Sequence, residues 1–97
     1  MDYREPIVLE CDAEVREFCI GVLEGHGGER SIMLAKYKDG RVMVVRDVSN
    51  GYMAEIFSSY KNVTNCYNLF FFDWCWAIRE GGEDEWTVVD DLSELRE

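Results

Sequence analysis

His26 is the first residue to examine for chemistry, because it is the only histidine of the 97-residue chain. It lies in the segment Gly25-His26-Gly27-Gly28, where the backbone has much freedom. An imidazole there could act as a general base or bind a metal. No partner motif accompanies it, and the glycines match neither the dinucleotide-binding nor the phosphate-loop pattern. We therefore expect His26 to be a surface residue and not a catalytic one.

Asp73 lies between Phe72 and Trp74, in the most apolar stretch of the sequence. A buried carboxylate there would need a partner such as Arg79, Arg46 or a backbone amide, and could be tuned for catalysis. Alternation along a strand would instead turn it towards solvent. With no second acid at a suitable spacing, the sequence predicts no catalytic residue, and we expect that the protein is not an enzyme.

The four cysteines do not form a metal-binding pattern. Cys11 and Cys19 are eight residues apart, and Cys66 and Cys75 are nine apart. Without a Cys-x-x-Cys pair, structural zinc is not expected, and no other metal or cofactor is indicated. The N-terminal sequence is charged from its second residue, which is unlike a secretory signal. The sequence thus favours reduced cysteines, a cytoplasmic location and no membrane-spanning segment.

The acidic balance is the most informative feature of the composition. Twenty acidic and ten basic residues give a formal net charge of −10. This charge argues against direct binding to nucleic acid or to an anionic membrane, and favours a basic protein partner. Residues 1–29 carry a net charge of −6, residues 30–79 of +3 and residues 80–97 of −7. The negative charge is therefore concentrated towards the two ends of the sequence.

Two groups of acids are the predicted partner-binding residues. At 100° per residue, four glutamates of the first predicted helix and its lead-in fall within a sector of roughly 80°. A second group follows near the C-terminus. An acidic stripe opposite an apolar one is also what any solvated amphipathic helix shows, so this alternative stays open. The predicted residues are Glu10, Glu14, Glu17, Glu24, Glu83, Asp84, Glu85, Asp90, Asp91 and Glu94.

Local patterns place these residues on a small set of elements. Residues 12–25 are predicted to form a helix, with Asp12 as N-cap and an apolar stripe of Val15, Phe18, Cys19 and Val22. Residues 31–47 are predicted to form a β-hairpin around a two-residue Asp39-Gly40 turn. That turn would put Met33 and Ala35 on one face with Val42 and Val44.

The C-terminal half is predicted less uniquely. Residues 51–61 are expected to be a second helix, with Met53, Ile56, Phe57 and Tyr60 as its apolar stripe. Residues 66–79 are too uniformly apolar to distinguish strand from helix. Residues 86–89 indicate a last strand, and Asp90 or Asp91 a cap for a final turn over 92–95. The predicted fold is α+β: one domain, 1–97, in which a small antiparallel sheet (hairpin 31–47 plus one or two C-terminal strands) packs against helices 12–25 and 51–61.

These features favour a non-enzymatic binding protein. Most of the large aromatic residues must form core, and one or two exposed members beside acids would mark a binding hot spot; the set is Trp74, Trp76, Trp86, Tyr67 and Phe70. In size, acidity and lack of catalytic motifs the chain resembles phage anti-defence inhibitors, including anti-CRISPR and anti-restriction proteins, and bacterial immunity proteins. That resemblance implies a decoy that mimics nucleic acid and occupies a basic nuclease or nucleic-acid-binding effector. The alternative is an accessory domain or small subunit of a cellular complex, monomeric or homodimeric.

Overall fold

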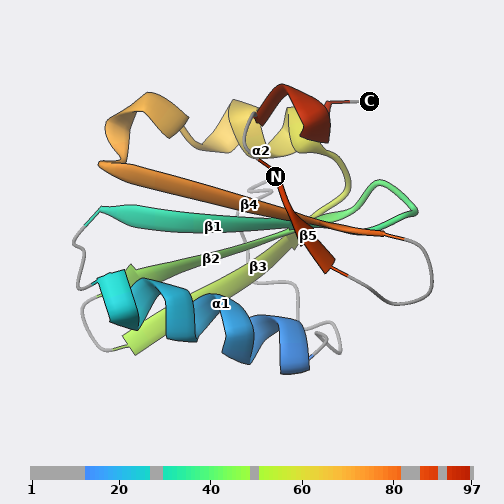
Figure 1. Ribbon diagram of the computed structural model, residues 1–97. Helices are drawn as coiled ribbons and strands as arrows, with labels where there is room; N and C mark the ends of the chain where they lie inside the picture. The colour runs from blue at the N-terminus through green and yellow to red at the C-terminus, as the bar shows by residue number, and fades with distance from the viewer. Residues whose placement is uncertain (1–12, 27–29, 49–50, 82–85, 90–91, 97) are drawn as a thin grey trace.

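The computed structural model describes residues 13–26, 30–48, 51–81, 86–89 and 92–96. Two α-helices, five strands and short 3₁₀ turns alternate along these residues (Figure 1). The elements are α1 (Ala13–His26), β1 (Ser31–Lys36), β2 (Val42–Val48), β3 (Gly51–Phe57), α2 (Tyr60–Cys66), η1 (Leu69–Phe71), β4 (Trp74–Glu80), β5 (Trp86–Val88) and η3 (Leu92–Leu95).

The five strands form one mixed sheet in the order β3-β2-β1-β4-β5. Strand β1 is central: it pairs antiparallel with β2 and parallel with β4. The α+β class is therefore confirmed, but a purely antiparallel sheet is not. The parallel β1–β4 pair arises because the chain crosses one face of the sheet, through α2 and η1, before it returns as β4.

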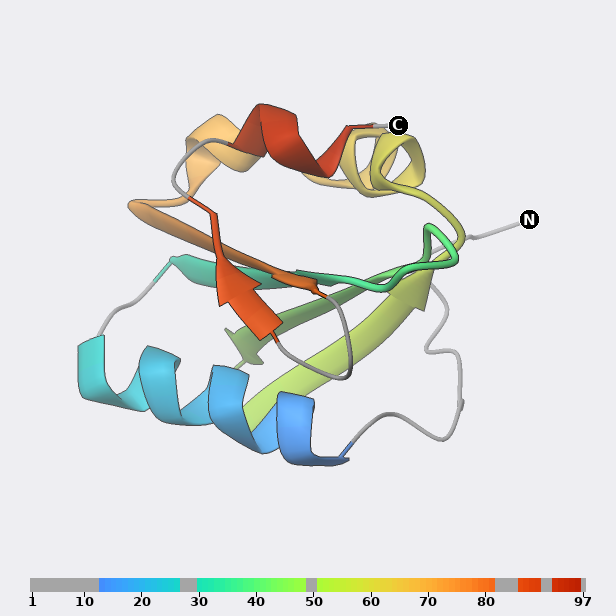
Figure 2. The same ribbon diagram turned by 45° about the vertical axis from the view of Figure 1, so that its right-hand side comes forward.

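Two layers of side chains cover the sheet. Helix α1 packs on one face, through Val15, Cys19 and Leu23. The C-terminal segments α2, η1 and η3 cover the other face, where Val63 and Leu95 are fully buried. Figure 2 shows this arrangement from a second angle, with α1 below the sheet and the C-terminal helical segments above it. Among the described residues, no helix is long and apolar enough to cross a membrane.

The predicted hairpin is confirmed, but its register is shifted. Lys36 pairs with Val42, and the N–H of Tyr37 donates to the carbonyl of Arg41 at 2.8 Å. The loop therefore has three residues, closed by Gly40 in the left-handed region (φ 97°). A shift of one residue exchanges the two faces of a strand. Met33 and Ala35 accordingly share a face with Met43 and Val45, and not with Val42 and Val44 as predicted.

The predicted helix over 51–61 is wrong. Residues 51–57 form β3, and the helix begins only at Tyr60, capped by the Ser59 hydroxyl. Because β3 is buried on both faces near its end, Ile56 and Phe57 point to opposite layers. In the sequence, Ile56 and Phe57 fit the pattern of an apolar helical stripe, although in the strand they lie on opposite faces.

The ambiguous stretch over 66–79 contains both structures. It holds the end of α2, the 3₁₀ turn η1 and most of β4. The last strand, β5, and the final turn, η3, lie where the sequence predicted them. The caps predicted at Asp12, Asp90 and Asp91 fall outside the described residues.

Candidate functional site

The described part of the predicted acidic surface is divided between the two faces of the sheet. Glu14, Glu17 and Glu24 are exposed on α1, on one side of the helix as predicted. Glu94 is exposed on η3, in the layer that covers the opposite face of the sheet. The structure therefore does not join these four acids in one surface. The other six predicted residues, Glu10, Glu83, Asp84, Glu85, Asp90 and Asp91, lie outside the described residues.

The excess of negative charge is carried by residues outside the described ranges. The described residues hold nine acidic and nine basic side chains, so their formal net charge is zero. The remaining segments hold eleven of the twenty acids and one of the ten basic residues. Because the described residues carry no net charge, an acidic face can arise only if their acidic and basic side chains lie on different sides of the fold.

The described acidic and basic side chains are separated in this way, with most acids on one side of the sheet and most bases on the other. Burial and the negative charges of Glu24 and Asp47 raise the pKa of Tyr52, which packs in the α1 layer and so places both acids on that side. Glu80 lies there too and lines the same pocket as Glu14. On the α1 side lie the described acids Glu14, Glu17, Glu24, Asp47 and Glu80, against Arg16. Arg41, over the Tyr37 ring at 4.9 Å, lies on this side too, but it is paired with Asp39. The opposite side carries Lys36, Arg46, Lys61, Arg79 and Arg96, against Glu55, Glu94 and Asp73, the last of which is paired with Arg30.

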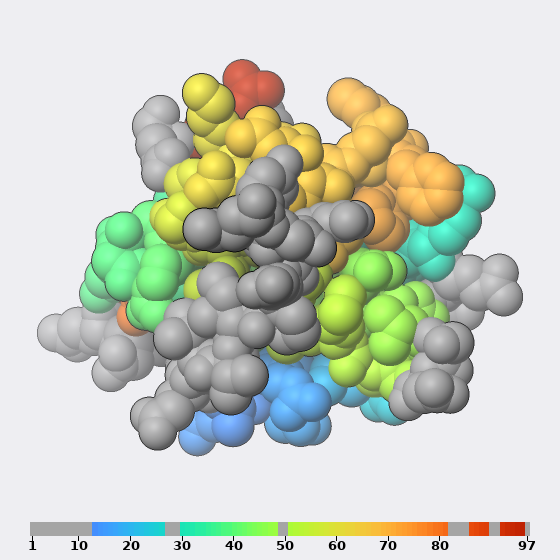
Figure 3. Space-filling view, turned by 180° about the vertical axis from the view of Figure 1, so that it is seen from behind, coloured from blue at the N-terminus to red at the C-terminus, as the bar shows by residue number. Residues whose placement is uncertain are grey.

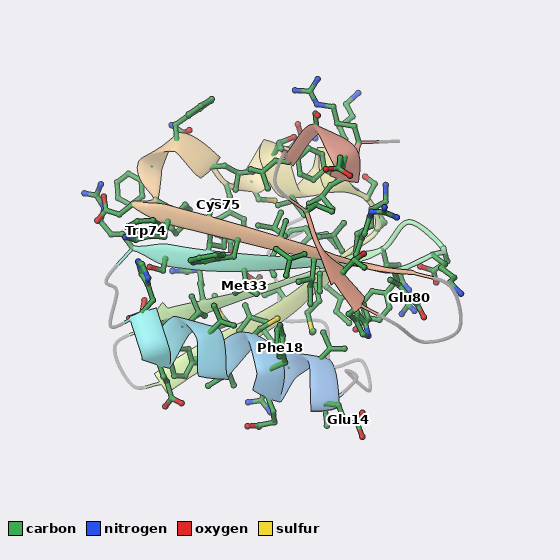
Figure 4. The ribbon with its side chains drawn as sticks, viewed as in Figure 1. Glu14, Phe18, Met33, Trp74, Cys75 and Glu80 are labelled. Carbon is green, nitrogen blue, oxygen red and sulfur yellow. The ribbon has the colours of Figure 1, made fainter. Side chains whose placement is uncertain are left out.

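A groove lies on the acidic side, between α1 and the β4–β5 end of the sheet. It has a volume of about 420 Å³ and is lined by Glu14, Val15, Phe18, Ile78, Glu80, Trp86 and Val88. Phe18 is 51% exposed and Val88 62% exposed, so large apolar side chains remain accessible to a partner. Figure 4 shows Glu14 and Glu80 towards the right of the view, with Phe18 nearer the middle of the molecule. The groove thus combines an apolar floor with carboxyl groups at its rim.

Sequence reasoning found Glu14 but missed three other groove residues. Phe18 was assigned to the buried stripe of α1, whereas the structure exposes it beside β5. Val88 and Glu80 were not selected at all. No signal in the sequence marks Val88, since its exposure on the three-residue strand β5 depends on what the rest of the fold places over it.

His26 and Asp73, the two residues considered for catalysis, each contact other side chains of the fold. The His26 ring contacts the edge of Trp74 at a centroid distance of 4.2 Å and lies 5.9 Å from Trp76. Asp73 is exposed and accepts a hydrogen bond from Arg30 at 2.9 Å. The outward orientation left open for Asp73 is therefore the one observed. His26 and Asp73 each have a described partner that accounts for their position.

A polar network is buried on the face away from α1. The Tyr67 hydroxyl donates a hydrogen bond to Glu55 and accepts one from the Nε of Arg46 at 3.3 Å. Glu55 is only 2% exposed, and its second carboxyl oxygen has no hydrogen-bond partner among the described residues. Burial first, and then the hydrogen bond to Glu55, raise the pKa of Tyr67 to about 12. This enclosed network is suited to holding β2, β3 and the α2–η1 segment together.

A second, wider hollow opens on the same face. It has a volume of about 1290 Å³ and lies between α2, η1, η3 and the start of β4. Cys66 and Cys75 line it. Burial raises the pKa of Cys75 to about 11, so this thiol stays protonated and a poor nucleophile near neutral pH. Within the described ranges, no three His, Cys, Asp or Glu side chains gather as metal ligands.

Comparisons with protein-family models, with curated proteins and with solved structures gave no match.

Proposed function

We propose that this protein is a non-enzymatic binding domain that takes a basic protein partner on the α1 side of its sheet. The observation that supports this function best is the groove, where exposed Phe18 and Val88 share one lining with Glu14 and Glu80. An apolar centre with a polar rim is the usual layout of a protein–protein interface. The acids further along α1 extend the same negative surface.

The partner that best fits this surface is a cationic, nucleic-acid-binding protein. Negative charge on one side of a small domain steers association with a positive cleft, and apolar contacts then slow dissociation. A decoy that competes with nucleic acid would use both effects. The chain's overall charge of −10 supports the same direction of steering.

Charge reversal on matched positions tests this function. Glu17→Lys and Glu94→Lys each change one exposed glutamate, the first on the α1 side and the second on the opposite side. We expect the immobilised wild-type protein to retain a cationic protein from a cell lysate at low salt, and to release it at high salt or on addition of duplex DNA. Glu17→Lys should reduce capture of that protein, identified by mass spectrometry, whereas Glu94→Lys should not.

Three results would contradict the proposal. They are equal capture by the two variants, capture that does not respond to salt, and capture of acidic or neutral proteins only. The last two would favour the accessory-subunit alternative, in which an apolar surface and not charge holds the partner. Equal thermal midpoints of the two variants would establish that the difference in capture does not come from unfolding.

A further inference from the structure

One half of β4 has a strand partner on one side only. Strand β1 pairs with Trp74–Arg79, whereas β5 pairs only with Ile78–Glu80. The N–H of Val89 then reaches the carbonyl of Ala77 at 3.2 Å. Within the described residues, nothing pairs with Trp74, Cys75 and Trp76 on the side away from β1. We refer to these three residues as the open edge.

The open edge lacks the features that usually prevent strands from pairing with other chains. It contains no lysine, no proline and no charged side chain, which are the common protections of an edge. Exposed aromatic residues lead into it: Phe70 is 98% exposed, and Phe71 and Trp74 are about half exposed (58% and 50%). Figure 3 shows the η1 segment, in orange, standing out from one end of the molecule. Strand β3, at the other edge of the sheet, has no exposed large apolar side chain.

Side chains along the open edge alternate between two different surroundings. Trp76 packs in the α1 layer and Trp74 stacks beside it, with ring centroids 6.3 Å apart. Cys75 points to the other face, where it lines the hollow of about 1290 Å³. A strand laid along this edge would therefore place alternate side chains on the tryptophans and in the hollow.

The charged lining of the hollow specifies what it would accept. Its charged side chains are Lys61, Asp73 and Arg96. Asp73 is engaged by Arg30 at 2.9 Å, while Lys61 and Arg96 form no ion pair within the part of the chain that the structure describes. The hollow consequently favours a carboxylate over an ammonium or guanidinium group.

We propose that the open edge binds an extended segment of a partner protein by strand addition. The segment places apolar side chains on Trp74 and Trp76, and acidic side chains in the hollow near Lys61 and Arg96. Main-chain hydrogen bonds supply affinity in this mode of recognition, and the surroundings of alternate side chains supply selectivity. The site lies at the opposite end of β4 from the groove and stands independently of the proposed function (Figure 4).

Synthetic peptides test this site directly. The probe is a fluorescein-labelled hexapeptide of alternating Glu and Val, with the same peptide N-methylated at alternate backbone positions as its matched control. A third peptide carries Lys in place of Glu. Fluorescence anisotropy should show saturable binding of the first peptide, and binding at least tenfold weaker for the other two. N-methylation removes main-chain donors without removing side chains, so it isolates strand pairing from simple apolar contact.

Protein variants locate the binding. Lys61→Gln should weaken the Glu/Val peptide several-fold, whereas Lys38→Gln, an exposed lysine in the hairpin loop, should not. Phe70→Ser changes a side chain that is almost fully exposed, so the variant should fold normally. If it no longer binds the Glu/Val peptide, the loss would not come from unfolding. In ¹⁵N spectra, the amides of Trp74, Cys75 and Trp76 should shift on addition of the peptide.

Several outcomes would overturn this proposal. Equal binding of the N-methylated peptide would exclude strand addition, and equal effects of Lys61→Gln and Lys38→Gln would exclude the hollow. If the Glu/Val peptide does not bind at millimolar concentration, the whole proposed site is excluded. A concentration-dependent dimer in sedimentation experiments, lost in Phe70→Ser, would show that a second copy of the chain occupies the edge instead. Loss of basic-partner binding in Glu17→Lys leaves this site unaffected, so the two proposals fail separately.

Discussion

Replacing Tyr67 by phenylalanine should destabilise the fold more than its half-buried position suggests. The Tyr67 hydroxyl donates the hydrogen bond that Glu55 receives, and it also accepts one from Arg46. Without the hydroxyl, the Glu55 carboxyl group stays in the core with neither oxygen bonded within the described structure. An unsatisfied buried polar group costs about 1–3 kcal/mol, and more if it is charged. We therefore expect Tyr67→Phe to lower the free energy of unfolding by about 3 kcal/mol.

A double substitution gives this prediction its sharpest form. Leucine at position 55 together with phenylalanine at 67 removes both members of the hydrogen bond, so no orphaned carboxyl group remains. The Glu55→Leu/Tyr67→Phe protein should therefore be more stable than Tyr67→Phe alone. Tyr52→Phe provides the matched control, because the Tyr52 hydroxyl has no described hydrogen-bond partner in the core, and it should change stability by less than about 0.5 kcal/mol.

Urea denaturation followed by tryptophan fluorescence measures all four proteins. For a domain of this size, a loss of 3 kcal/mol corresponds to a fall in thermal midpoint of about 12–24 °C. The reasoning is refuted if Tyr67→Phe loses less than about 1 kcal/mol, or if the double variant is no more stable than the single one. Either result would mean that Glu55 finds another partner when Tyr67 is absent.

Two further predictions concern backbone and pH. Gly40→Ala should destabilise the protein by about 1–2 kcal/mol because Gly40 has φ 97°, whereas Gly21→Ala, in the open on α1, should stabilise it by up to about 1 kcal/mol; equal signs in thermal unfolding would contradict this. Burial raises the pKa of Cys75 to about 11 and that of Cys19 to about 12, from 9.0 in both cases, so these thiols stabilise the fold fully below pH 9. As the pH rises towards 11 the unfolded chain loses these protons first, and the free energy of unfolding should fall by about 2–4 kcal/mol for the two thiols together. Denaturation curves at pH 8 and pH 10.5 measure the fall, and a constant midpoint would refute it.

The hairpin shows how far local sequence signals reach. Asp39-Gly40 predicted the turn correctly, because glycine is needed where φ is positive. The length of the loop depends on whether one or two residues take that conformation, and the sequence does not state this. The difference is one residue of register, which exchanges every side chain of β2 between the two layers.

Segment 51–57 shows the limit set by burial. A strand covered on both faces has apolar residues at odd and even positions, so the spacing of Met53, Ile56 and Phe57 satisfies a helical pattern equally well. The groove shows the same limit at the candidate site. Phe18 has the spacing of a core residue, yet it is half exposed in the groove that it lines together with Trp86 and Val88 of β5.

The central position of β1 divides the fold into two halves that can form in succession. Helix α1 and strands β1, β2 and β3 are consecutive in the chain, so their contacts close only short loops. The parallel pairing of Ser31 with Trp74 joins residues far apart in sequence and must follow a longer search. Substitutions among α2, η1 and β4 should therefore act mainly on the rate of unfolding, and those between α1 and β2 mainly on the rate of folding. The part of the fold that carries the open edge, namely α2, η1 and β4, would then form last during folding and separate first during unfolding.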